Sequence, residues 1–168
     1  TMSQAPKATW PLKGVTAMVA DQKGFLWVIR GNRVEKLTNR GASTGIAIAS
    51  LARPERLTIG KRGKLHVFDD STLQVHIFEN LSASPVLSST FGALGGIYSG
   101  VVGKVAPDKL LPKCAGLALD SSDNLYLAWG GVAPVAGTDL RSYSPSGSMR
   151  WQLLGHTFVA CGGFDPGT

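Results

Sequence analysis

The 168-residue chain has only two cysteines and three histidines. Cys114 and Cys161 are not spaced as a CxxC pair and no histidines cluster near them, which argues against a zinc site. They leave two interpretations open, a disulfide or two small buried thiols. A nucleophile elbow, a P-loop and an HExxH motif are also lacking. We therefore expect no catalytic residues, no metal and no cofactor from the motifs.

Long hydrophobic runs are missing as well. No apolar stretch approaches the roughly 20 residues that a helix needs to cross a bilayer, so we expect no membrane span. Residues 1–11 lack the apolar centre of an intact signal peptide. The sequence does not determine the cellular compartment of the protein. We expect a secreted or periplasmic protein if a signal peptide has been removed.

Charge is sparse and unbalanced. Charged residues make up 17% of the chain and hydrophobic residues 43%, which is a globular composition, and the net charge is +6. A basic chain suits an anionic partner such as RNA or a glycan, and equally suits simple solubility. The best candidate for an anion-binding patch is the set Arg53, Arg56, Lys61, Arg62 and Lys64.

What the chain does contain is a five-residue motif that occurs three times, at residues 24–28, 63–67 and 123–127; we call it the repeated phrase. Each copy has a turn residue, a variable residue, a leucine, an aromatic residue or histidine, and a branched aliphatic residue. One apolar or alternating run precedes each copy and two follow it, and each run predicts a further strand. They lie at 15–21, 33–37 and 46–49, at 54–60, 73–78 and 86–91, and at 114–120, 140–143 and 149–154. Four strands in about 40 residues are typical of one β-propeller blade.

The repeats are unevenly spaced. Gly63 follows Gly24 by 39 residues, whereas Asp123 follows Gly63 by 60. We assign the excess to a glycine-rich loop at 92–113 on one rim of the fold, and long loops of this kind often carry function. An apolar run at 158–165 predicts a terminal strand that begins a fourth repeat.

The stretch 91–155 resembles the NHL repeat, most clearly at 116–120, 124–128 and 140–143. That family forms six-bladed β-propellers in bacterial surface proteins, animal RNA-binding regulators and some lyases. The resemblance implies an all-β fold of four-stranded antiparallel blades in a single domain, 1–168. The blades lie at about 12–50, 51–92 and 112–155, with the loop at 92–113 and the terminal strand at 158–165. The chain departs from the family at Pro54-Glu55 and at 130–138, where the usual Pro-Gly and the usual link are replaced.

Three blades make half of a six-bladed ring and leave two uncovered flanks, which attract partners. Either the missing blades belong to a longer chain, or two copies close the ring as a homodimer with two-fold symmetry. We favour the homodimer, because an open half should be poorly soluble.

The function we favour is noncatalytic binding of a protein or glycan through the rim loops, which we place at 92–113 and 129–138. Trp129, Tyr98 and Trp151 are the candidate ligand-binding residues, since exposed aromatic rings stack on sugars and partner side chains. Packing between blades is the alternative for Trp129. A propeller-type lyase or lactonase with a channel metal, or RNA binding through the basic patch, are the alternative functions. We favour both less than protein or glycan binding.

Overall fold

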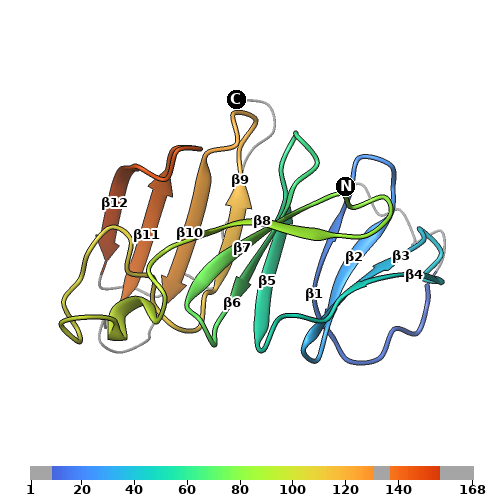
Figure 1. Ribbon diagram of the computed structural model, residues 1–168, viewed down its shortest axis with the longest axis horizontal. Coiled ribbons are helices and arrows are strands. Elements are labelled where there is room, and N and C mark those ends of the chain that lie inside the picture. Colours follow the sequence, from blue (N-terminus) through green and yellow to red (C-terminus); the bar gives the residue numbers. More distant parts are fainter. Residues whose placement is uncertain (1–8, 131–136, 156–168) are drawn as a thin grey trace, which may run out of the picture.

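The computed structural model describes residues 9–130 and 137–155, and these residues form three four-stranded antiparallel sheets (Figure 1). Each sheet uses four consecutive strands in chain order. Sheet 1 contains β1 (Val15–Ala20), β2 (Leu26–Arg30), β3 (Arg33–Leu37) and β4 (Ser43–Ile48). Sheet 2 contains β5 (Pro54–Ile59), β6 (Leu65–Asp69), β7 (Gln74–Glu79) and β8 (Val86–Phe91). Sheet 3 contains β9 (Gly116–Leu119), β10 (Leu125–Gly130), β11 (Thr138–Tyr143) and β12 (Met149–Gly155). The predicted all-β fold with three blade-like sheets is confirmed.

The first hairpin of each sheet is closed by the turn that the repeated phrase predicts. Asp21 accepts hydrogen bonds from the amides of Lys23 and Phe25, and Asp120 does the same for Ser122 and Asn124. Such side-chain acceptors fix a tight turn because they replace missing backbone partners. The phrase therefore recurs because each sheet starts with the same hairpin.

Two apolar cores fill the two seams between the sheets. The first seam joins Trp27 and Ile29 of sheet 1 to Leu65 and Val67 of sheet 2. The second joins Phe68 and Val75 of sheet 2 to Leu127, Trp129 and Tyr143 of sheet 3. Strand side chains alternate between the two faces of a sheet, so sheet 2 contributes one face to each seam.

The first strands β1, β5 and β9 lie side by side and make most of the strand contacts between sheets. The sheets spread from this inner line like blades (Figure 1). Propeller blades show the same arrangement around a central channel. In the described ranges no helix is long and apolar enough to cross a membrane.

Some predictions fall on residues outside the described ranges. They are the terminal strand at 158–165, with Cys161, and most of the segment 129–138.

Candidate functional site

The loop at 92–113 is a folded unit and fills the wedge between sheets 2 and 3. Its side chains Ile97, Leu110 and Leu111 are buried in the second core. A short 3-10 helix, η1 (Gly96–Tyr98), turns the chain there, and the Ile97 amide bonds the Leu110 carbonyl at 2.9 Å. The sequence gave no sign that Ile97, Leu110 and Leu111 of this loop belong to the core.

Polar side chains of sheet 3 hold the loop by its carbonyl groups. The Trp129 indole donates to the Leu111 carbonyl at 2.8 Å, and the Tyr143 hydroxyl donates to the Pro107 carbonyl at 2.7 Å. Arg141 donates to the Lys109 carbonyl at 2.9 Å. Each of these donors is buried, so the bonds form away from competing water and fix the path of the loop.

Arg141 is neutralised by Asp139, two residues earlier on the same face of β11. Both side chains are fully buried, and the guanidinium lies 2.7 Å from the carboxylate. Burial acts to lower the pKa of Arg141, but its hydrogen bonds with Asp139 outweigh that effect and raise it. Gln152 adds a hydrogen bond to the same carboxylate at 3.0 Å. Sequence reasoning missed this pair because the predicted strand began at 140, whereas β11 begins at Thr138. Residues i and i+2 of a strand share a face, so the longer strand brings the two charges together.

The outward side of the loop is apolar and exposed. We call Tyr98, Val101, Val102 and Val105 the apolar tip; their exposed fractions run from 49% to 69%. The ammonium group of Lys109 donates hydrogen bonds to the carbonyls of Ser99 and Val101, and these bonds link the two ends of the segment that carries the tip. Tyr98, a predicted binding residue, therefore lies on a fixed and exposed surface.

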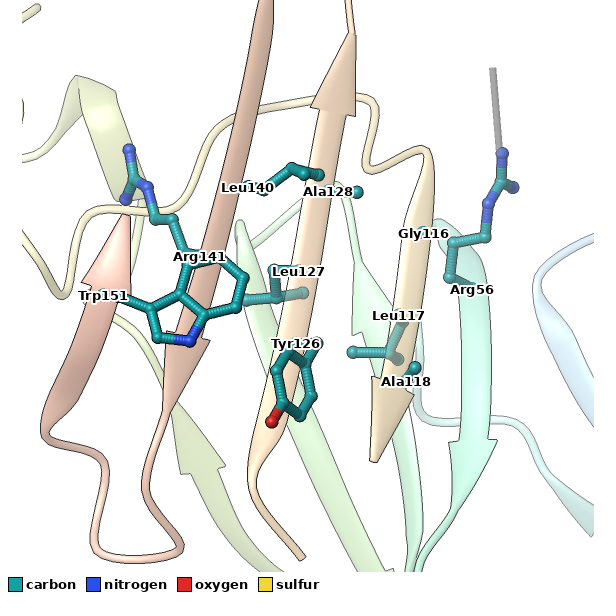
Figure 2. A pocket seen from close by; sticks show the side chains of 10 residues that line it. All are labelled: Arg56, Gly116, Leu117, Ala118, Tyr126, Leu127, Ala128, Leu140, Arg141 and Trp151. Atoms are coloured by element: carbon teal, nitrogen blue, oxygen red, sulfur yellow. The ribbon is translucent and has the colours of Figure 1, made fainter. Parts of the chain in front are cut away.

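A second surface lies on the outer face of sheet 3, where a hollow of about 320 Å³ opens. Figure 2 shows Tyr126, Leu140 and Trp151 along it, one from each of β10, β11 and β12. The Tyr126 and Trp151 rings lie 5.9 Å apart, and Trp151 is 44% exposed. Trp151, a predicted binding residue, thus lines a mostly apolar hollow that Arg56 and Arg141 also border. Tyr126, which was predicted only as a strand residue, lines it as well.

Trp129 lies on the opposite face of the same strand. Its side chain is buried in the second core, so its position matches the packing alternative and not a rim pocket. The alternation of β10 explains the difference, because Tyr126 and Ala128 face outward while Leu127 and Trp129 face inward.

The predicted anion-binding residues are largely engaged within the protein. Arg53 pairs with Asp70, Arg62 with Asp123 at 3.2 Å, and Lys64 with Glu79 at 3.2 Å. Arg56 donates to the carbonyls of Ala115 and Glu55. These residues are spread along sheet 2, and acidic neighbours offset much of their charge.

A second hollow, of about 370 Å³, lies beside the first strands and is lined by Thr16, Glu55, Arg56, Lys113 and Cys114 among others. Burial raises the pKa of the Cys114 thiol to about 12, so it stays protonated. Burial, followed by the charge of Asp70, raises the pKa of Glu55. Within the described ranges no three His, Cys, Asp or Glu side chains come together as metal ligands.

Comparison with protein-family models gives no match, and no curated protein matches the chain. Solved structures do match. A streptogramin B lyase is 10% identical with a TM-score of 0.53, and the alignment covers 88% of this chain and 42% of the lyase. A protein of unknown function from Bacteroides caccae is 16% identical with a TM-score of 0.58, covering 81% and 47% of the two chains. Virginiamycin B lyase from Staphylococcus aureus is 11% identical with a TM-score of 0.51, covering 84% and 41%.

At these identities the likeness concerns the fold alone. The chain spans less than half the length of each of these structures. The matches support a propeller-like fold and do not confirm membership of the NHL family.

Proposed function

We propose that this chain is a noncatalytic binding module that contacts a protein partner through the apolar tip of loop 92–113. The observation that supports this most is an exposed group of apolar side chains on a loop whose backbone is held from behind. Exposed apolar groups that cluster on a folded protein commonly mark interaction sites.

The way the loop is anchored bears on affinity. Ordering a mobile loop costs free energy at the moment of binding, and a loop that is already ordered avoids that cost. Lys109, Arg141 and Tyr143 order this loop in the free protein. The tip can therefore bind with little rearrangement.

The chemistry of the tip favours a protein over a glycan. Three of its four side chains are valines, which offer no donors or acceptors to sugar hydroxyls, and Tyr98 is its one aromatic ring. An apolar groove suits the valines, and an acidic edge on that groove would complement the exposed Lys104.

The alternatives are less well supported. Two structural neighbours are lyases by name, so an enzyme remains the alternative that the fold suggests. RNA binding through the basic residues has lost support, because most of them are paired with acidic or carbonyl groups.

A capture experiment with matched variants tests the proposal. The double variant Val101→Ser, Val102→Ser makes two of the four side chains of the apolar tip polar. Val86→Ser, Leu87→Ser is the control, because those side chains are also apolar and exposed but lie on β8. Immobilised wild type and control should retain the same protein from a nuclease-treated lysate. The purified partner should then bind the tip variant at least tenfold more weakly, since each buried valine contributes about 1–2 kcal/mol.

Two results would count against the proposal. Equal affinity of the tip variant and the wild type would show that the tip is not the contact. Capture that disappears with nuclease treatment and falls steeply with salt would favour RNA instead.

A further inference from the structure

One lysine in the first seam departs from the pattern of the repeats. Lys36 lies on β3 and pairs across strands with Trp27, the fourth residue of the repeated phrase in sheet 1. The corresponding position holds Ile77 in sheet 2 and Ser142 in sheet 3. An apolar or a small side chain therefore fits this place in a sheet, and the fold itself does not require a charge there.

The ammonium group of Lys36 is buried and has few partners. The residue is 5% exposed, and its Nζ donates a hydrogen bond to the Leu81 carbonyl at 2.9 Å. Asp21 Oδ2 lies 3.9 Å away, which is too far for a second hydrogen bond. The centres of the Phe25 and Trp27 rings lie at 4.4 Å and 5.4 Å, and their faces attract the cation. An ammonium group has three donors, and in the part of the chain that the structure describes only the Leu81 carbonyl accepts one.

A third hollow, of about 210 Å³, lies in the first seam and is lined in part by Lys36. Ile59 and Leu81 give it apolar walls from sheet 2. The side chain of Gln22, which also lines it, donates a hydrogen bond to the Lys61 carbonyl at 2.9 Å. This bond joins the first turn of sheet 1 to the first turn of sheet 2, so the hollow is bordered by turns that are held together.

The charges around this hollow favour a singly charged anion. Its ionisable lining residues are Asp21, Lys23 and Lys36, so one positive charge has no counterpart among them. Asp21 Oδ1 already accepts hydrogen bonds from the amides of Lys23 and Phe25. An anion with one negative charge would match the surplus, whereas a doubly charged phosphate would bring excess negative charge close to Asp21.

We propose that the hollow between sheets 1 and 2 binds a small organic monocarboxylate. Its carboxylate accepts hydrogen bonds from the Lys36 ammonium group, and its short apolar chain lies against Ile59 and Leu81. A water molecule takes about 30 Å³, so the hollow has room for a short-chain carboxylic acid. The apolar tip belongs to the loop between sheets 2 and 3, so this proposal and the proposed function can fail independently.

Titration with sodium butyrate at constant ionic strength tests the proposal, followed by amide shifts in two-dimensional NMR spectra of the isotope-labelled protein. The amides of Gly63, Leu81 and Ser82 line the hollow, and their signals should shift and then saturate. Butyramide has the same chain without the charge and should leave them in place. Inorganic phosphate should bind more weakly than butyrate.

Two pairs of variants locate the contact. Lys36→Met keeps the unbranched stem and should weaken butyrate binding at least tenfold, because it removes the charged donor. Lys64→Met is its control, since Lys64 is 44% exposed and pairs with Glu79 at 3.2 Å, and it should bind as the wild type does. Ser82→Glu adds a negative charge at the exposed edge of the hollow and should also weaken binding. Ser84→Glu, in the same exposed turn but outside the lining, should weaken it less.

Circular dichroism and the urea midpoint establish that each variant is folded, and Ser82→Glu tests the site without altering the buried seam. Equal binding of butyrate and butyramide would show that the hollow recognises no charge. Shifts that do not saturate, tighter binding of phosphate than of butyrate, or unchanged affinity in Lys36→Met and Ser82→Glu would overturn the proposal.

Discussion

Asp139 and Arg141 show how much one pair of side chains can determine. Both are fully buried, and Arg141 also bonds the loop carbonyls. Removing one member of a buried pair leaves an uncompensated charge, which typically costs about 3–5 kcal/mol. We expect Asp139→Asn to lower the free energy of unfolding by that amount in urea titrations.

The double variant Asp139→Leu, Arg141→Met is the informative control. It removes both charges and keeps apolar volume, so it should destabilise the protein less than Asp139→Asn alone. If Asp139→Asn unfolds at the wild-type urea concentration, the pair has no such role.

Asp120 gives a prediction for how the stability of the fold changes at acid pH. Burial alone would raise its pKa, but hydrogen bonds from Asn124, Ser122 and Tyr126 outweigh this and hold the pKa at about 2, below the ordinary 3.8. A lowered pKa means that the folded state favours the ionised carboxylate, so its contribution is present above about pH 4 and is lost as the pH falls toward about 2.

The variant Asp120→Asn should therefore lose less stability than the wild type between pH 6 and pH 2.5, as measured by urea midpoints. Parallel losses in the two proteins would show that this carboxylate does not contribute to the acid dependence.

Individual residues also show what sequence reasoning can reach. The common position of Trp27, His66 and Tyr126 could be predicted, because the phrase that contains them repeats. The inward position of Trp129 follows from strand alternation once Tyr126 is placed outward. That Trp129 would meet the Leu111 carbonyl could not be predicted, because the path of a non-repeating loop has no periodic signal.

Among the elements, the loop at 92–113 depends for its packing on Gly96 more than on its other glycines. Gly96 has a φ of +47°, and a Cβ there would lie 2.2 Å from the Leu110 carbonyl oxygen and 2.7 Å from Leu73 Cβ. Gly100 also has a positive φ, +55°, but a Cβ there would meet nothing within 4 Å. The two positions thus share a left-handed backbone conformation, but only at Gly100 is there room for a Cβ atom.

We expect Gly100→Ala to cost about 1–2 kcal/mol from the left-handed backbone alone. Gly96→Ala should cost about 1–3 kcal/mol more, because the loop must move away from sheet 2 to make room. Thermal unfolding of both variants measures the difference, and hydrogen exchange at 96–111 should increase only for Gly96→Ala. Equal costs at the two positions would mean that the loop is not packed as described.

The strands and this loop differ in how far the sequence predicts them. All twelve strands follow from alternation and turn residues, and the fourth strands were placed within about three residues at each end. The loop was recognised by its excess length, yet its glycines suggested an open segment. Its core residues Ile97, Leu110 and Leu111 are too scattered to form a pattern, so their burial depends on contacts with distant strands.

For the whole molecule, counting repeats predicted the three-sheet architecture, and the neighbouring structures support the propeller-like fold. Function was less accessible, because many unrelated activities use propellers. The apolar tip proposed here as the binding site can be recognised only once the loop at 92–113 is packed against sheets 2 and 3, because that packing decides which of its side chains are buried and which are exposed.

The order of the two cores along the chain has a consequence for synthesis. Within residues 9–130 and 137–155, the members of the first core run from Ala17 to Leu81 and precede the loop at 92–113 and the whole of sheet 3. Sheets made of consecutive strands need few distant partners, and N-terminal units generally fold first during translation. The first seam can thus be complete while sheet 3 is still being made, and sheet 3 then adds to a surface that already has its final shape.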